Sequence, residues 1–152
     1  MRVLFLSAAL LTAWALHADT AVQKKALELK DVKTNTRIVH RDKSGRMTGS
    51  STRSGDRIIH RDSAGRFDGT TTLSGNRTIY RDKNGRMTGS STTSGNRTVY
   101  RDATGKFAGT AQKSGNTVIY RDASGRMVNR STVSGGSTIY RDSAGRFSGT
   151  SR

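Results

Sequence analysis

The stretch TIYRDKNGRMTG, residues 78–89, carries most of the information that decides the fold. It opens with β-branched and aromatic residues, which are typical of a β-strand. Residues 82–85, Asp-Lys-Asn-Gly, are typical of a type I turn that ends on a glycine in the left-handed conformation. The stretch therefore predicts a β-hairpin with a three-residue loop.

This hairpin belongs to a 20-residue unit that recurs six times between Arg37 and the C-terminus. A second turn signal, Ser94-Gly95-Asn96, also has counterparts along the array, and a glycine followed by Asn, Asp or Gly is typical of a two-residue hairpin loop. Two reversals per unit favour antiparallel hairpins over a parallel β-helix. We therefore expect an all-β fold of tandem antiparallel hairpins, arranged as an open meander or a hairpin solenoid.

The predicted loop also assigns side chains to the two faces of the sheet. It places Asp82 opposite Arg86, Arg81 opposite Met87 and Tyr80 opposite Thr88, and cross-strand pairs share a face. One face then presents Ile79 and Met87, which we expect to form the core. Tyr80 lies on the other face, which we expect to be the exposed working surface. The recurring glycine at Gly89 predicts a bulge, a bend or a close backbone approach.

The chain divides into three segments. Residues 1–18 combine a short basic start with an apolar run and small residues, the pattern of a secretory signal peptide. Residues 19–36 form a linker or a helical capping segment, and residues 37–152 form the six hairpin repeats. We expect a protein that is secreted, periplasmic or held at the cell surface, with no transmembrane segment in the mature chain.

The composition is strongly basic, with 27 Lys and Arg against 11 Asp and Glu, a formal net charge of +16, and no cysteine. The positive charge is spread along the array. A field of this sign favours nucleic acid, anionic polysaccharide, lipopolysaccharide or acidic lipid as partners. A solvated, self-repelling surface that keeps the protein soluble is the alternative interpretation.

Residues 78–89 resemble the hairpins of choline-binding and glucan-binding cell-wall repeats, which carry an aromatic, an Asp/Asn-x-x-Gly turn, then Met or Phe, then Gly. The array also resembles secreted bacterial tandem-repeat proteins of the Tyr-x-Asp-x-x-Gly-Arg type. Both resemblances imply a hairpin architecture. Choline binding does not follow, because it needs tryptophan cages and the only tryptophan here is Trp14, in the predicted signal peptide.

Catalysis and metal binding have no support in the residue pattern. His40 and His60 occupy the tyrosine position of the unit, which predicts a stacking role. Each turn offers one carboxylate, whereas Ca²⁺ takes six to eight oxygen ligands. We expect a non-enzymatic protein without a cofactor or metal.

The candidate site is a pair of ladders in which arginine recurs beside an aromatic residue, a combination suited to phosphate, sulfate or sugar recognition. The predicted ligand-binding residues are Arg41, Arg61, Tyr80, Arg81, Tyr100, Arg101, Tyr120, Arg121, Tyr140 and Arg141. The predicted function is binding of an anionic envelope or extracellular polymer. The alternative is a structural matrix or fibre protein that self-associates through its sheet edges.

Overall fold

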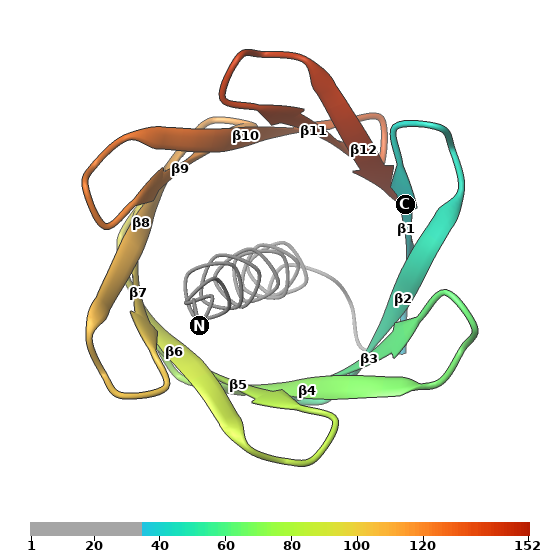
Figure 1. The fold of residues 1–152 in the computed structure, drawn as a ribbon, viewed down its shortest axis with the longest axis horizontal. Helices are drawn as coiled ribbons and strands as arrows, with labels where there is room; N and C mark the ends of the chain where they lie inside the picture. The colour runs from blue at the N-terminus through green and yellow to red at the C-terminus, as the bar shows by residue number, and fades with distance from the viewer. Residues whose placement is uncertain (1–34) are drawn as a thin grey trace, which may run out of the picture.

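The computed structural model describes residues 35–152, in which the strands form a closed antiparallel barrel (Figure 1). The predicted all-β array of hairpins is confirmed. The predicted signal peptide and nearly all of segment 19–36 lie outside the described residues. Each repeat contributes two strands, of which the second is the longer in every repeat but the last, and each strand pairs with its neighbours in sequence.

The strands are β1 (Arg37–Asp42), β2 (Met47–Ser54), β3 (Arg57–Asp62), β4 (Phe67–Ser74), β5 (Arg77–Asp82), β6 (Met87–Ser94), β7 (Arg97–Asp102), β8 (Phe107–Ser114), β9 (Thr117–Asp122), β10 (Met127–Ser134), β11 (Ser137–Asp142) and β12 (Phe147–Ser151).

Both predicted turns are present. In the turn from Asp82 to Arg86, the Gly85 N–H donates to the Asp82 carbonyl at 3.0 Å and the Asp82 N–H donates to the Arg86 carbonyl at 2.9 Å. Gly85 has a φ of +80°, the left-handed conformation that the loop requires. At the other turn, Gly95 has a φ of +54°. We call the first type, residues 42–46 and their equivalents, the Asp turns.

A β-bulge follows the Asp turn and alters the predicted register. Arg81 pairs with Met87 as expected, but Tyr80 pairs with Gly89 and leaves Thr88 as the extra residue. Ile79 consequently pairs with Ser90. The predicted pairing of Tyr80 with Thr88 is therefore wrong by one residue.

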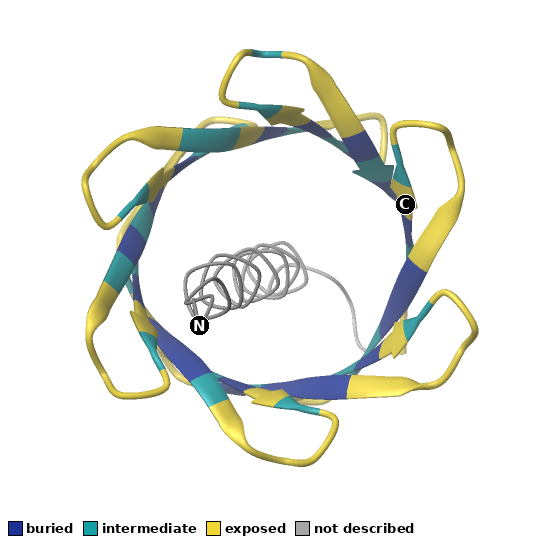
Figure 2. Ribbon diagram, viewed as in Figure 1, coloured by how far each residue is buried: buried dark blue, intermediate teal, exposed yellow. Residues whose placement is uncertain are grey.

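The predicted assignment of the buried face is also wrong. Tyr80 is 1% exposed, whereas Met87 is 38% exposed and Ile79 is half-buried. The face that carries Ile79 also carries Arg77 and Arg81, and burial of unpaired guanidinium groups is prohibitively unfavourable. The tyrosine face, which lacks Arg77 and Arg81, is therefore the one that turns inward. Figure 2 shows burial concentrated along the barrel wall and exposure at the turns.

Closure joins the first strand to the last. β1 pairs with β12 through His40 and Ser151, a register equivalent to the pairing of His60 with Ser51 between β2 and β3. Reciprocal hydrogen bonds between Val39 and Arg152, at 2.7 and 3.1 Å, extend this seam. The meander is thus closed and not open, and closure leaves no unpaired edge strand in the described barrel.

Because the seam has the repeat's own register, equivalent residues of the six units form rings around the barrel. Strand direction alternates around the sheet, so every Asp turn lies at one end of the barrel. In Figure 1 these turns splay outward from the ring, for example between β3 and β4.

The fifth unit departs from the pattern at Asn129. In most of the other units a glycine stands at this position, with φ between +142° and +158°. A Cβ there would overlap a carbonyl oxygen of a neighbouring hairpin, as at Gly69 and Arg81. Asn129 has no positive φ, and its buried Oδ1 has no hydrogen-bond partner. Next to it, Arg130 is exposed where the equivalent Ser50 is buried. The asparagine keeps the strand register of the other units but leaves a buried oxygen without a hydrogen bond.

We expect Asn129→Gly to stabilise the barrel by about 1 kcal/mol, because loss of an unsatisfied buried amide outweighs the added backbone entropy of glycine. The reverse change in a neighbouring unit, Gly69→Asn, is the matched control and should destabilise. Chemical denaturation followed by circular dichroism measures both. A destabilised Asn129→Gly variant would show that the asparagine makes a favourable contact at this position.

Candidate binding surface

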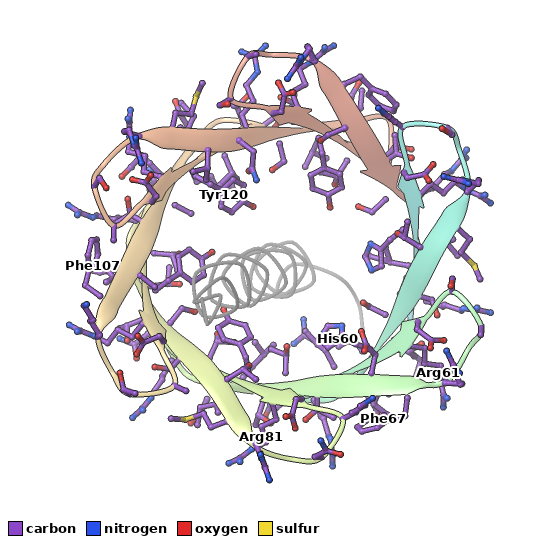
Figure 3. The ribbon with its side chains drawn as sticks, in the orientation of Figure 1. His60, Arg61, Phe67, Arg81, Phe107 and Tyr120 are labelled. Atoms are coloured by element: carbon purple, nitrogen blue, oxygen red, sulfur yellow. The ribbon has the colours of Figure 1, made fainter. Side chains whose placement is uncertain are left out.

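The structure separates the two predicted ladders onto opposite faces of the sheet. In Figure 3, His60 and Tyr120 point into the ring, whereas Arg61 and Arg81 point out of it. The cause is strand alternation, which sends each arginine and the aromatic residue before it to opposite faces. The predicted site residues are therefore not brought together as one mixed arginine and tyrosine surface.

The inward face carries a hydrogen-bond network that begins at the two histidines. His40 Nε2 lies 2.8 Å from Ser51 Oγ, which lies 2.9 Å from His60 Nδ1. His60 Nε2 in turn lies 2.8 Å from Thr71 Oγ1. All four side chains are buried. The histidines thus take the structural place of tyrosine, as their position in the repeat predicts.

The tyrosines continue this arrangement in later units. Tyr80 Oη lies 2.8 Å from Ser91 Oγ, and Tyr140 Oη lies 2.9 Å from Ser151 Oγ. Tyr80 also packs in a buried cluster with Tyr100 and Tyr120. Burial raises the pKa of the Tyr80 phenol well above its ordinary value, although the hydrogen bond to Ser91 acts in the opposite direction. Tyr80 therefore stabilises the barrel as a neutral side chain.

The outward arginines form an exposed ring at the Asp-turn end, which we call the Arg ring. Its members are Arg41, Arg61, Arg81, Arg101, Arg121 and Arg141, and all are exposed. Each donates from Nη1 to the glycine carbonyl of its own Asp turn, at 2.9 Å for Arg41 and Gly45. This hydrogen bond holds the guanidinium group against the turn in every unit.

The turn carboxylate pairs with a different arginine. Asp62 Oδ1 accepts hydrogen bonds from the N–H groups of Ala64 and Arg66, both at 2.9 Å. Asp62 Oδ2 accepts from Arg66 Nε at 2.9 Å, and Asp42, Asp122 and Asp142 make the equivalent ion pair. The predicted pairing of turn aspartate with the following arginine is thus present in these units. The aspartate closes the turn, and its ion pair is not with the Arg ring.

These contacts make a testable prediction about acid titration. The side-chain hydrogen bond from Arg66, followed by the backbone N–H of Arg66, lowers the pKa of Asp62 below 3.8. A lowered pKa stabilises the fold above the unfolded-state pKa, and this contribution is lost as the pH falls through the folded-state value. NMR titration of the carboxyl group should give a pKa for Asp62 below 3.8.

Arg66→Gln should move the pKa of Asp62 back toward 3.8, because it removes the Nε donor. Arg61→Gln is the control and should leave the pKa of Asp62 nearly unchanged. An equal rise in both variants would show that the general positive field sets the pKa, with no specific role for the turn.

Exposed apolar side chains form a second ring beside the arginines, which sequence reasoning placed in the core. This apolar ring consists of Met47, Phe67, Met87, Phe107, Met127 and Phe147, which are 36–43% exposed. Each pairs across the hairpin with a member of the Arg ring, as Phe67 does with Arg61. In Figure 3, Phe67 and Phe107 lie on the outside of the barrel. The predicted pairing of Arg81 with Met87 was the signal that could have placed this ring outside.

The part of the chain that the structure describes contains no group of three or more His, Cys, Asp or Glu side chains that could hold a metal ion. Over the same residues, no helix has the length and hydropathy needed to cross a membrane. The outward face thus offers cations, exposed apolar groups and hydrogen-bond donors. This set is suited to binding an anion.

Comparisons with protein-family models, with curated proteins and with solved structures found no match.

Proposed function

We propose that this protein is a non-enzymatic module that binds an anionic polymer of the cell envelope or extracellular space through its outward Arg ring. The observation that supports this most directly is the exposure of six equivalent arginines around one closed barrel. Residues 35–152 carry 22 Lys and Arg against eight Asp. Such a field attracts polyanions and accelerates their association.

The ring geometry favours multivalent binding. Each guanidinium group is oriented by its own turn and exposes further donors, which suits bidentate contacts to phosphate, sulfate or carboxylate groups. One such contact is weak, but a polymer that engages several neighbouring units gains avidity. The tyrosines, which are buried on the opposite face, support the barrel and do not contact the polymer in this proposal.

The alternative function, a fibre built by pairing of sheet edges, loses its physical basis in this topology. Edge pairing requires a strand with unpaired backbone groups, and β1 and β12 pair with each other. No observation on the described residues favours the fibre over the binding module.

The test is salt-dependent binding to heparin and to DNA. We expect retention of the wild-type protein on heparin to fall steeply with salt, because binding releases counterions from the polymer. The triple variant Arg61→Gln, Arg101→Gln, Arg141→Gln should weaken DNA binding by roughly tenfold or more. It should also reduce the slope of log K against log salt by about three.

The matched control removes the same number of charges from the Asp turns. It is the triple variant Arg66→Gln, Arg126→Gln, Arg146→Gln. These arginines pair with turn aspartates, so the control should weaken binding much less. Equal losses in the two triple variants would show that net charge alone drives binding. Salt-independent retention of the wild-type protein would contradict the proposed function.

A further inference from the structure

The apolar ring lacks an explanation in polyanion binding. A single exposed phenylalanine or methionine on a protein surface needs none. Here, however, an apolar side chain is exposed in every one of the six units, at the same position of the hairpin. Because the six apolar groups recur around a closed barrel, together they form an extended apolar surface, and such surfaces mark interaction sites.

The location of this ring is specific. Each member begins the strand that leaves an Asp turn, so all six lie at the end of the barrel where those turns splay outward. The opposite end, with the Ser-Gly turns, carries Val133 as its only large exposed apolar side chain among the described residues. The two ends of the barrel therefore differ in chemistry.

Each hairpin combines cations with an apolar group at its tip, by which we mean the Asp turn and the Arg-ring and apolar-ring residues that flank it. In the second unit, Arg61 pairs directly with Phe67 across the hairpin, and Arg66 precedes Phe67 in the chain. The other units repeat this set with Met or Phe in alternation, and Lys106 replaces the arginine before Phe107 in the fourth unit. A surface that alternates guanidinium and apolar groups at this spacing complements a partner that has both negative charge and hydrocarbon.

The interchange of Met and Phe further limits the chemical class of the partner. Stacking on sugar rings or nucleobases requires a flat aromatic face, which methionine lacks. Methionine and phenylalanine share only apolar bulk, and methionine is adaptable at such contacts. Strict alternation of the two around the ring therefore indicates burial in a fluid apolar phase.

We propose that the Asp-turn end of the barrel docks on the surface of an anionic lipid bilayer. The apolar ring enters the boundary between headgroups and acyl chains, and the Arg ring contacts the lipid phosphates. This inference rests on the proposed function in one respect, because both use the Arg ring. It differs in naming lipid as the partner and in assigning a role to the apolar ring.

The geometry suits a flat surface. Equivalent tips of six hairpins lie at one end of a barrel whose seam repeats the register of the other hairpin junctions, so several tips reach one plane together. Partial insertion of one side chain gives weak, reversible binding, and attraction of basic groups to anionic lipid adds to it. Several tips acting together make the attachment stable.

The experiment measures sedimentation of the full chain with vesicles of phosphatidylcholine, alone or mixed with phosphatidylglycerol. We expect binding only to the mixed vesicles. The triple variant Phe67→Ser, Phe107→Ser, Phe147→Ser should lower the vesicle partition coefficient by roughly tenfold or more. The far-end variant Val133→Ser should bind as the wild type does. Circular dichroism confirms that each variant is folded.

Heparin retention of the same variants separates this inference from the proposed function. The triple serine variant should keep wild-type retention on heparin while it loses vesicle binding. If the wild type fails on heparin but binds mixed vesicles in a way that depends on the phenylalanines, the proposed function falls and the lipid inference stands. If the triple serine variant binds vesicles as the wild type does, the lipid inference is overturned.

A fluorescence readout tests insertion directly. Phe107→Trp places an indole in the apolar ring, and the wild type, whose only tryptophan is Trp14, provides the background signal. Mixed vesicles should shift the emission of the variant to the blue relative to that background. Vesicle binding without any shift would show that the ring stays in water, which overturns the inference.

Discussion

Gly69→Val should destabilise the barrel by on the order of 3 kcal/mol, since it introduces steric overlap at a buried junction between hairpins. Gly69 has a φ of +142°, and a Cβ there would overlap the carbonyl oxygen of Arg81 in the next hairpin. Any adjustment must therefore move backbone atoms of two adjacent strands. Urea denaturation followed by circular dichroism measures the change in unfolding free energy.

Gly75→Ala is the control that isolates this contact. Gly75 has a φ of +56°, but an added Cβ would meet no atom within 4 Å. Only the backbone conformation is then unfavourable, at about 1–2 kcal/mol. If the two substitutions destabilise equally, the close approach between Gly69 and Arg81 contributes nothing to stability.

Tyr80→Ala should destabilise by about 3–5 kcal/mol, the range typical of large buried aromatic side chains. Tyr80 is 1% exposed, belongs to a buried cluster with Tyr100 and Tyr120, and forms a hydrogen bond with Ser91. Heparin retention of the folded fraction should be unchanged, since the side chain lies on the face opposite the Arg ring. This expectation reverses the sequence-based prediction that Tyr80 contacts a ligand.

Tyr80→Phe separates the hydroxyl from the ring. It keeps the packing but leaves Ser91 Oγ buried without its phenol partner, so we expect a loss of about 1–2 kcal/mol. Thermal unfolding of the two variants, with heparin retention measured on each, gives the comparison. A fully stable Tyr80→Ala variant that fails to bind heparin would instead identify the tyrosine as a ligand contact.

The hairpins and turns were predictable because their determinants are local. The carboxylate of Asp62 contacts groups no more than four residues away, and Gly65 adopts its left-handed conformation within the same turn. Such contacts need no other part of the molecule. Because the unit repeats, the same local prediction applied to every hairpin.

The recurring glycine at Gly89 had indicated a bulge, a bend or a close backbone approach, but the register beyond it and the choice of buried face were not predictable from these local signals. The bulge at Thr88 lies within one hairpin, where Arg81 pairs with Met87 and Tyr80 pairs with Gly89. The prediction that Ile79 and Met87 share a face was right, and Arg81 lies on that face too, opposite Met87. The error was to expect that face to be buried, which placed the apolar ring in the core and the tyrosines outside.

The amino-acid sequence thus dictated the strands, both turns and the aspartate contacts that close them, because each depends on interactions within about five residues. Tertiary structure decided which face is buried, and with it which residues can bind a partner. The physical reason is closure: once β1 pairs with β12, one face must line the inside of the barrel. The face on which Tyr80 and Ser91 hydrogen-bond to each other could turn inward without burying the charge of Arg81.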